Sequence, residues 1–413
     1  MTILWIVAAA IAAVALAYLL TPWYIRLVDR SRSNSRSTIT YEHELPRFFV
    51  RGKRGIETGV QWPGWDAWTV CAIPTGCDAP AHMVRGTLMT GLYGLEGVDN
   101  YEQLMSRLST NDVVEHLCMV PTTSQLPDGS SIVLNNFAQS YLPKDRDLLM
   151  ADGKLDVTVL GSRVDTEVTN VPYGHIRGTW PDYQIELLSP AAEIEVEMSF
   201  HGRRVLWWID LPGRYTHFAT LGRFQVTIRY MRGVNVQDVH RPAPRPEEVR
   251  FEARGAVEHL SAVRPAGFHQ VWRRMLAAGS WVPALKPVRH HSEVFLSDSI
   301  EGGIMHTRAL GRTLRNGGGL FAGDRYHEIK SVKVRYEEAD PVDNCGGVGD
   351  YTPVWRKWRV EAVTDAGPLT YTAERTHPPA LVSPNGNQYH FTYSGTWGSE
   401  AISGSGYGEY FRF

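Results

Sequence analysis

Cysteine is scarce in this sequence, and the motifs of several large enzyme classes are missing from it. The 413 residues include 4 cysteines, and their spacing matches no zinc site. Reduced structural thiols are the simplest interpretation, but Cys71 and Cys77 could form a disulfide across a short loop if the chain were exported. No GxSxG elbow, kinase set, P-loop or dinucleotide-binding pattern is visible. The sequence therefore predicts neither a metal nor another cofactor.

An excess of charge of one sign is also lacking. The formal net charge is −2, from 42 Lys and Arg against 44 Asp and Glu, which creates no overall field for nucleic acid. We therefore predict no nucleic-acid partner. A hydrophobic content of 43% and a charged content of 21% are typical of a globular protein. The length favours about two domains.

A long uncharged run opens the chain. No residue between positions 3 and 20 is charged, and a helix of this length, at about 1.5 Å per residue, can span a bilayer. No basic segment precedes the run, whereas several arginines follow it between residues 26 and 36. The positive-inside rule then predicts a single-pass anchor with the globular part in the cytoplasm. The alternative is an uncleaved or atypical export signal.

Alternating apolar and polar residues characterise the chain from about residue 130 onwards. Examples are the stretches 155–159, 193–200 and 224–230, in which every second residue is apolar. Short alternating strands separated by Gly and Pro turns predict antiparallel sheets with one solvated face. The sequence therefore predicts a sandwich or a barrel.

Breaks in this pattern indicate the domain boundaries. The segment 265–287 interrupts the strands with a short helix and a loop. Near residue 99, Asp99 is suited to an N-cap and the apolar residues after it share one helical face. We expect an anchor at 1–24, a linker at 25–58, a first domain at 59–264 with a helical insertion near 99–118, an interdomain linker at 265–287 and a second domain at 288–413.

The C-terminal stretch "GYGEYFRF" has a counterpart near the middle of the chain. Aligned with "RGAVEHL", it matches Gly406 to Gly255, Glu409 to Glu258 and Tyr410 to His259. We predict two similar β units, each closed by a strand with one glutamate, and Gly406 and Gly408 would let the second closure bend. The alternative role of each glutamate is an ion pair with a nearby arginine. The tripeptide "GTW" also occurs twice, at 178–180 and 395–397.

The two-unit pattern, the phrase "WWIDLPGRYTHFATLGRF" at 207–224 and the terminal "GYGEY" carry a family resemblance. Over roughly residues 60–413 the chain resembles the lipocalin-like proteins grouped with carotenoid 1,2-hydratase (hydroxyneurosporene synthase) and the AttH proteins, and it is similar to bacterial relatives of that group. The resemblance implies an all-β fold of two tandem lipocalin-like antiparallel β-barrels or sandwiches behind the N-terminal transmembrane helix. It also implies a deep apolar pocket between or within them.

The chemistry of the hydratases does not carry over with the fold. These enzymes add water to an isoprenoid double bond with a phrase of the type Trp-Asp-His-x-Trp, which this sequence lacks. The stretch nearest to it offers Trp208, Asp210, Tyr215 and His217 in a different order and spacing. A fold alone does not supply a reaction.

Acid-assisted chemistry on an alkene still makes clear demands on the residues. It needs a carboxyl that burial keeps protonated, and aromatic faces that stabilise a carbocation. Asp210, beside Trp207 and Trp208, fits this description best, although "DLPG" also opens an ordinary turn. His217 and Tyr215 share one face of a strand, and their alternative role is a half-buried aromatic pair.

The closing glutamates complete the set of candidate residues. Glu258 and Glu409 would be polar partners in a pocket if their strands turn them inward. The predicted catalytic residues are Asp210, His217, Glu258 and Glu409, and the predicted ligand-binding residues are Trp207, Trp208, Tyr215, Trp397 and Tyr410.

Two functions remain open from the sequence. In the first, the protein binds an isoprenoid- or lipid-like molecule in an apolar β-barrel pocket and catalyses its acid-assisted hydration, isomerisation or cyclisation. In the second, it is a non-catalytic, membrane-anchored lipid carrier or scaffold. The expected partners are a hydrophobic small molecule and the membrane, through the N-terminal helix. The sequence does not define the oligomeric state.

Overall fold

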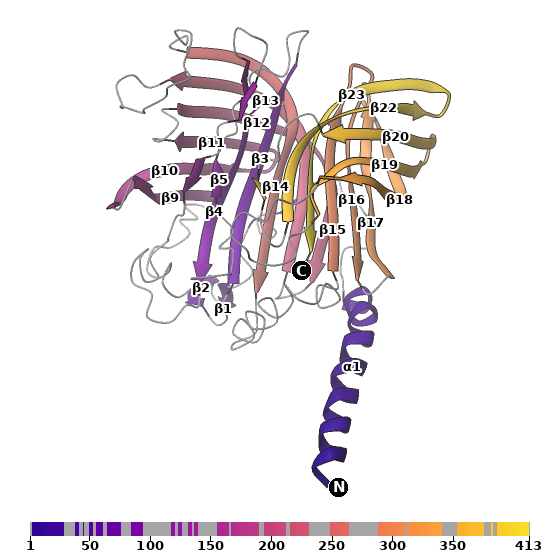
Figure 1. The fold of residues 1–413 in the computed structure, drawn as a ribbon. Coiled ribbons are helices and arrows are strands. Elements are labelled where there is room, and N and C mark those ends of the chain that lie inside the picture. Colours follow the sequence, from indigo (N-terminus) through magenta and orange to yellow (C-terminus); the bar gives the residue numbers. More distant parts are fainter. Residues whose placement is uncertain are drawn as a thin grey trace.

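Among the residues that it describes, the computed structural model shows one helix and two large antiparallel β-sheets that lie side by side (Figure 1). It describes residues 2–28, 38–40, 44, 49–52, 55–60, 64–75, 84–93, 117–119, 123–125, 131–133, 136–138, 155–164, 167–189, 194–211, 215–230, 248–263, 288–309, 312–340, 353–375, 381–382 and 386–412.

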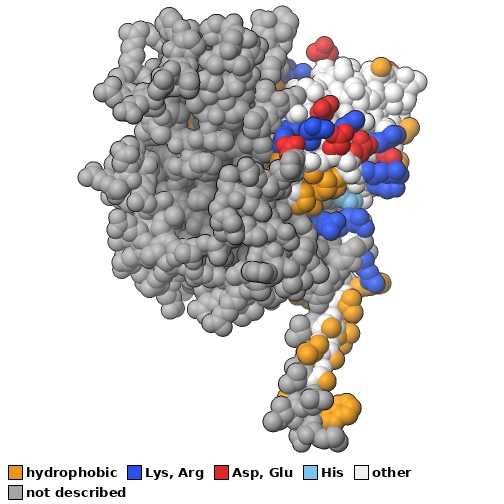
Figure 2. Space-filling view, in the orientation of Figure 1, with side chains coloured by type: hydrophobic (Ala, Val, Ile, Leu, Met, Phe, Trp, Pro, Cys, Tyr) orange, Lys and Arg blue, Asp and Glu red, His pale blue; other side chains and the backbone are white. Residues whose placement is uncertain are grey.

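Helix α1 (Thr2–Val28) forms where the uncharged run predicted a helix. Its alanines and leucines are strong helix formers. Large apolar side chains along it are exposed (Figure 2), and they are Trp5, Ile6, Ile11, Leu16, Leu19, Leu20, Trp23, Tyr24 and Leu27. Within the part of the chain that the structure describes, no helix is long and apolar enough to cross a membrane. The membrane anchor therefore stays a prediction.

The first sheet has ten strands in the order β8-β5-β4-β3-β14-β13-β12-β11-β10-β9. They are β3 (Gly64–Pro74), β4 (Val84–Tyr93), β5 (Leu117–Met119), β8 (Asn136–Ala138), β9 (Leu155–Val164), β10 (Glu167–Thr179), β11 (Asp182–Ser189), β12 (Ile194–Leu211), β13 (Tyr215–Tyr230) and β14 (Glu248–Val263). The sheet curls, because β9 returns to lie beside β4 and β8. No pairing closes it among these described strands. Within the described residues the first unit is therefore a curled antiparallel sheet, whereas the prediction was a barrel or a sandwich.

Two short hairpins accompany the first sheet. One pairs β1 (Phe49–Gly52) with β2 (Gly55–Val60), and the other pairs β6 (Thr123–Gln125) with β7 (Ser131–Val133). The first hairpin lies in the stretch predicted as a linker, 25–58. The predicted helical insertion near 99–118 lies outside the described residues except for its end, which belongs to strand β5. The predicted interdomain linker at 265–287 lies outside them as well.

The second sheet closes into a barrel. Eight of its strands form a ring in the order β20-β19-β18-β17-β16-β15-β23-β22, which the pairing of β20 with β22 completes, and β21 extends β22. The strands are β15 (Val288–Leu296), β16 (Ile300–Ala309), β17 (Arg312–Ala322), β18 (Arg325–Ala339), β19 (Trp355–Thr364), β20 (Gly367–Arg375), β21 (Leu381–Val382), β22 (Gly386–Trp397) and β23 (Glu400–Arg412). This up-and-down order is that of lipocalin-like barrels. It confirms the antiparallel barrel predicted for the second unit.

The two stretches aligned in the sequence occupy equivalent strands. β14 pairs with β3 and β13, while β23 pairs with β15 and β22. Each therefore lies between the first long strand of its unit and the strand that comes just before it in the sequence. The "GTW" tripeptides are not equivalent, because the first lies at the end of β10, far from β14 in strand order, and the second ends β22, beside β23.

Glycines in the closing strands have different roles. A Cβ at Gly255 would meet the carbonyl oxygen of Cys71 at 1.9 Å, a close backbone approach of the kind predicted. A Cβ at Gly406 would instead meet the ring of Phe391 at 2.3 Å, and one at Gly408 the ring of Tyr389 at 2.6 Å. Gly406 and Gly408 therefore make room for aromatic rings inside the barrel, rather than for a bend.

Side-chain alternation gives the first sheet two different faces. The inner face carries buried aromatic residues such as Trp68, Tyr183 and Phe218. The outer face packs against the barrel, in a cluster that includes Trp207 and Leu206 from the sheet. Gly303 on the barrel permits this contact, since a Cβ there would approach Leu206 to 2.7 Å and Trp207 to 2.9 Å.

Candidate functional site

Three carboxylates with histidine neighbours lie in different parts of the described structure, and Glu44 and Glu293 are buried whereas Glu258 is partly buried. Glu44 lies on the inner face of the first sheet, Glu258 lies between the two units, and Glu293 lies inside the barrel. Their hydrogen bonds differ. Glu44 has one carboxyl oxygen without a partner among the described residues, whereas the contacts of Glu258 and Glu293 favour structural roles.

Glu44 is fully buried and only half of its carboxyl group has partners. The hydroxyl of Tyr183 on β11 and the backbone N–H of Trp180 both donate to Oε1, the second over 3.1 Å. The other oxygen, Oε2, has no hydrogen-bond partner among the described residues. Burial raises the pKa of Glu44 above its ordinary value, although the two donors and nearby His259 oppose this rise. The protonated form is therefore favoured relative to that of an exposed glutamate.

Tyr183, which donates to Glu44, belongs to a cluster of aromatic rings on the inner face. The ring of Trp68 stacks on that of His259 with centroids 4.3 Å apart, and it meets Phe218 and Tyr183 edge-on at 6.0 and 5.4 Å. Burial, with Glu44 as a second cause, raises the pKa of Tyr183 well above its usual range. Tyr183 therefore stays a hydrogen-bond donor to Glu44. An acid set among aromatic faces is the arrangement that acid-assisted chemistry requires.

Glu293, on β15 inside the barrel, has partners on both oxygens. Trp358 Nε1 donates to Oε1, which also lies 2.7 Å from His291 Nε2, and the hydroxyl of Tyr371 donates to Oε2. His291 in turn lies 3.2 Å from the hydroxyl of Tyr389. Burial, followed by the charge of Glu293, raises the pKa of Tyr371 and of Tyr389 well above the usual range. The network joins several strands of the barrel and leaves Glu293 fully engaged.

The predicted residues His217 and Glu258 meet between the two units. His217 Nε2 and Glu258 Oε1 form a hydrogen bond across β13 and β14. The ring of His290, on β15, lies 5.4 Å from that of His217, and its Nδ1 is 2.8 Å from Thr307 Oγ1. Burial lowers the pKa of His290 well below its usual range, and the neighbouring histidines add to this effect. His290 therefore stays neutral at physiological pH.

The space beside this pair is small. Glu258 and Trp207 line a cavity of about 20 Å³ together with Tyr407 of the barrel, which is room for roughly one water molecule. Glu409 lies on the same outer face of the barrel, where it accepts a 2.7 Å hydrogen bond from the Tyr407 hydroxyl. An organic ligand does not fit in this cavity, and the geometry favours a structural role at the interface.

The structure separates the predicted catalytic residues. In the β12–β13 register, Asp210 faces Thr216 and Trp208 faces Phe218, which places Asp210 and Trp208 on the inner face. His217 and Trp207 lie on the outer face, because neighbouring residues of a strand alternate. Asp210 therefore does not share a cavity with His217. It lies at the end of β12, buried, on the same face as Trp68 and His259.

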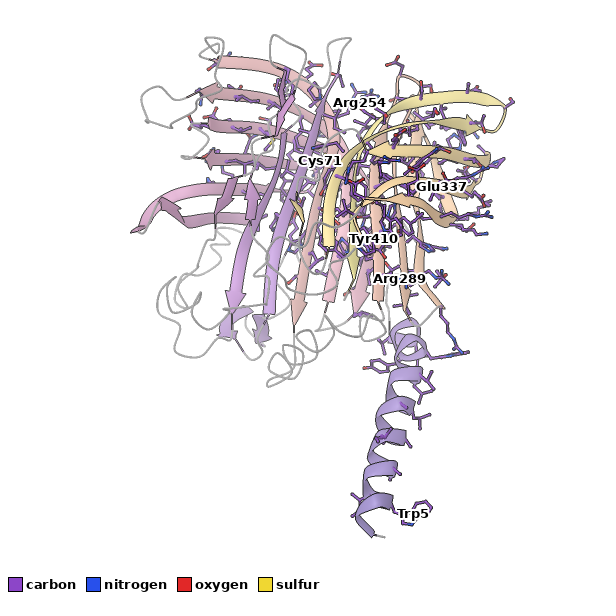
Figure 3. The ribbon with its side chains drawn as sticks, viewed as in Figure 1. Trp5, Cys71, Arg254, Arg289, Glu337 and Tyr410 are labelled. Carbon is purple, nitrogen blue, oxygen red and sulfur yellow. The ribbon has the colours of Figure 1, made fainter. Side chains whose placement is uncertain are left out.

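The remaining predicted ligand-binding residues lie apart from one another. Tyr215 begins β13, and its side chain is outside the described residues. Trp397 donates from Nε1 to Thr364 Oγ1 over 3.2 Å at the end of the barrel. Tyr410 is buried in the barrel, where it contacts Tyr336 and Trp355 edge-on (Figure 3). Their roles in ligand binding stay predictions.

Sequence reasoning missed both Glu44 and Glu293. Glu44 belongs to the stretch predicted as a linker, where no periodicity marks a core residue. Glu293 follows the "RHH" histidines on a strand that the pattern did predict. Because alternate residues share a face, Glu293, His291 and Phe295 could have been placed together in the barrel interior. No group of three or more His, Cys, Asp or Glu with metal-binding geometry occurs among the described residues.

Comparisons with known proteins give little beyond this geometry. No protein-family model matches the sequence, and no curated protein matches it. Among solved structures, the crystal structure of CghA aligns at 10% identity over 85% of this chain and 88% of that chain, with a TM-score of 0.48. The crystal structure of CghA with Sch210972 aligns at 9% identity over 92% and 98%, with a TM-score of 0.47. Similarity at this level supports no conclusion about function, and the family resemblance stays a prediction.

Proposed function

We propose that the protein binds an apolar, isoprenoid- or lipid-like molecule and catalyses its acid-assisted hydration, isomerisation or cyclisation on the inner face of the first sheet. Glu44 is the acid in this proposal. The observation that carries it is a fully buried carboxyl with a raised pKa and one oxygen that has no partner among the described residues. Glu44 replaces Asp210 as the leading candidate because burial raises its pKa and aromatic rings flank it.

The geometry suggests how the proton would move. Glu44 donates its proton from Oε2 to one carbon of a double bond, whose π electrons form the new C–H bond and leave a cation on the other carbon. The faces of Trp68 and Phe218 stabilise that cation. The carboxylate left behind keeps its hydrogen bonds from Tyr183 and Trp180. It then takes back a proton, either from a neighbouring carbon in an isomerisation or cyclisation, or from an added water in a hydration.

Helix α1 supports a membrane source for such a ligand. Its large apolar side chains are exposed, with Leu27 84% exposed and Trp5 72% exposed, and this surface is unfavourable in water. We propose that α1 anchors the protein in the membrane, with the globular part in the cytoplasm, as the arginines that follow the helix favour. Sedimentation of the protein with membranes, and its release when residues 2–28 are deleted, would test the anchor.

Mass spectrometry would test the reaction. Purified full-length protein is incubated with a membrane lipid extract, and bound and free lipids are identified over time. We expect a product that differs from its precursor by one water or that is an isomer of it, and we expect Glu44→Gln to abolish it. Glu186→Gln is the matched control, because Glu186 lies on the same strand as Tyr183 and its side chain is 46% exposed. Bound lipid with no product over time would instead support the non-catalytic carrier.

A further inference from the structure

A polar cleft lies between the two units, apart from the three carboxylate clusters. Its volume is about 880 Å³, enough for a small organic molecule. One wall consists of strands β11 to β14 of the first sheet. The other consists of the β15–β16 and β17–β18 turns of the barrel, which contribute Asp298, Ser299 and Asp324.

A row of basic side chains crosses the wall formed by the first sheet. His201 on β12 pairs directly with Arg223 on β13, and Arg223 pairs directly with Arg254 on β14. All three line the cleft. Like charges at directly opposite positions of a sheet repel one another, so each of them needs an opposite charge nearby.

Two members of the row have acidic partners. His201 Nδ1 lies 2.7 Å from Asp182 Oδ1. Arg254 lies 3.4 Å from Glu301 and also donates to the carbonyl oxygen of Ser297 over 3.0 Å. Arg223, between them, is exposed, and its side chain forms no ion pair or hydrogen bond with any other residue that the structure describes. Among the described residues, its guanidinium group is therefore the cation of the row that is available to a ligand.

The cleft also contains acids, and these restrict the ligand. Glu252 and Asp298 line it, are exposed and form no side-chain ion pair within the described residues. A purely anionic ligand would meet repulsion from them, whereas hydroxyl or amino groups would be attracted. The cleft therefore favours a molecule with one anionic group and several hydrogen-bond donors.

We propose that Arg223 binds the phosphate or carboxylate group of a small soluble molecule whose hydroxyl or amino groups face Glu252 and Asp298. A guanidinium fork binds either anion through two parallel hydrogen bonds. The position of the cleft favours a soluble ligand over a lipid headgroup. Arg254, at the cleft, lies at the end of the molecule that is far from α1, whereas Arg289 lies near that helix (Figure 3).

Isothermal titration calorimetry with the full chain tests this site. The probes are glycerol 3-phosphate, inorganic phosphate and 3-hydroxybutyrate, and a separate titration uses vesicles that contain phosphatidic acid. We expect glycerol 3-phosphate to bind more tightly than inorganic phosphate, because its hydroxyl groups reach the acids. Arg223→Ala should weaken this binding at least tenfold, and Arg223→Lys should weaken it less, since a lysine keeps the charge but loses the fork.

Arg312→Ala is the matched control, because Arg312 is an exposed arginine that begins β17 outside the cleft. Its affinity for glycerol 3-phosphate should equal that of the unmodified protein. Absence of binding by the unmodified protein, equal binding by Arg223→Ala, or binding to phosphatidic acid vesicles alone would each overturn the proposal. The melting temperature of Arg223→Ala should not change, since the side chain is exposed.

Discussion

Glu44 in the first unit and Glu293 in the barrel are both fully buried glutamates that accept a hydrogen bond from a tyrosine hydroxyl. They differ in what else reaches the carboxyl group. Glu293 has partners on both oxygens, from Trp358, His291 and Tyr371, whereas one oxygen of Glu44 has none among the described residues. Burial alone therefore does not identify a catalytic acid. The number of donors around the carboxyl group separates an acid that can give up a proton from a carboxylate that holds a core together.

Removing the Glu293 carboxylate should have the largest effect on the free energy of unfolding. Glu293→Ala would leave the Trp358 N–H, the Tyr371 hydroxyl and His291 buried without their acceptor. Loss of one partner from a buried network costs about 3–5 kcal/mol, so we expect the free energy of unfolding to fall by that amount. Chemical denaturation of the variant measures it. A loss as small as that of an exposed glutamate such as Glu186 would contradict the structural role of Glu293.

His306 in the barrel and Glu44 in the first unit should make the free energy of unfolding depend on pH in opposite ways. Burial, with a contribution from His291, lowers the pKa of His306 on β16 to about 4. The unfolded chain then binds this proton more readily than the folded chain, so stability is lost as the pH falls from 6.5 towards 4. A shift of this size corresponds to at most about 3 kcal/mol. His306→Gln should flatten this part of the stability profile, and an unchanged slope would refute the assignment.

Glu44 should make stability depend on pH in the opposite direction to His306. Its pKa is raised in the folded protein, so its contribution to stability is present at low pH and is lost as the pH rises above the ordinary value of a glutamate. Glu44→Gln removes this titration. At neutral pH we expect the variant to be as stable as the unmodified protein, or more stable by about 1 kcal/mol. A marked loss of stability in denaturation experiments would show that Glu44, like Glu293, is structural.

The last comparison is the difference in stability cost between two tyrosine variants. Tyr371→Phe removes one of several donors to Glu293 and should cost about 1.5–3 kcal/mol of stability, the usual range for a hydrogen bond to a charged group. Tyr183→Phe removes a donor to Glu44, whose pKa burial raises above its ordinary value. Because a raised pKa favours the neutral form of the acid, the stability cost should be smaller. Thermal unfolding of both variants gives the comparison. Equal costs would indicate that Glu44 is ionised in the folded protein.

Period-two alternation predicted the strands well because each face of a strand has one environment. The closing strands β14 and β23 were also found from sequence, since "RGAVEHL" and "GYGEYFRF" occupy equivalent places. Alternation does not show whether a sheet closes, because closure depends on how its edge strands meet. The sequence therefore left a barrel and a sandwich open for both units, and only the structure shows that the second unit is a closed barrel. Asp210 and His217 were grouped by proximity in sequence, but the β12–β13 register places them on opposite faces.

Product formation by Glu44→Gln tests the central claim most directly. The variant and the Glu186→Gln control are incubated with the same membrane lipid extract, and product is measured by mass spectrometry while melting temperatures are recorded. A general acid typically contributes about 10²–10⁴-fold to the rate. We predict a loss of that size in Glu44→Gln, with a melting temperature no lower than that of the unmodified protein, and full activity in the control. Product formation at the same rate in Glu44→Gln would contradict the account.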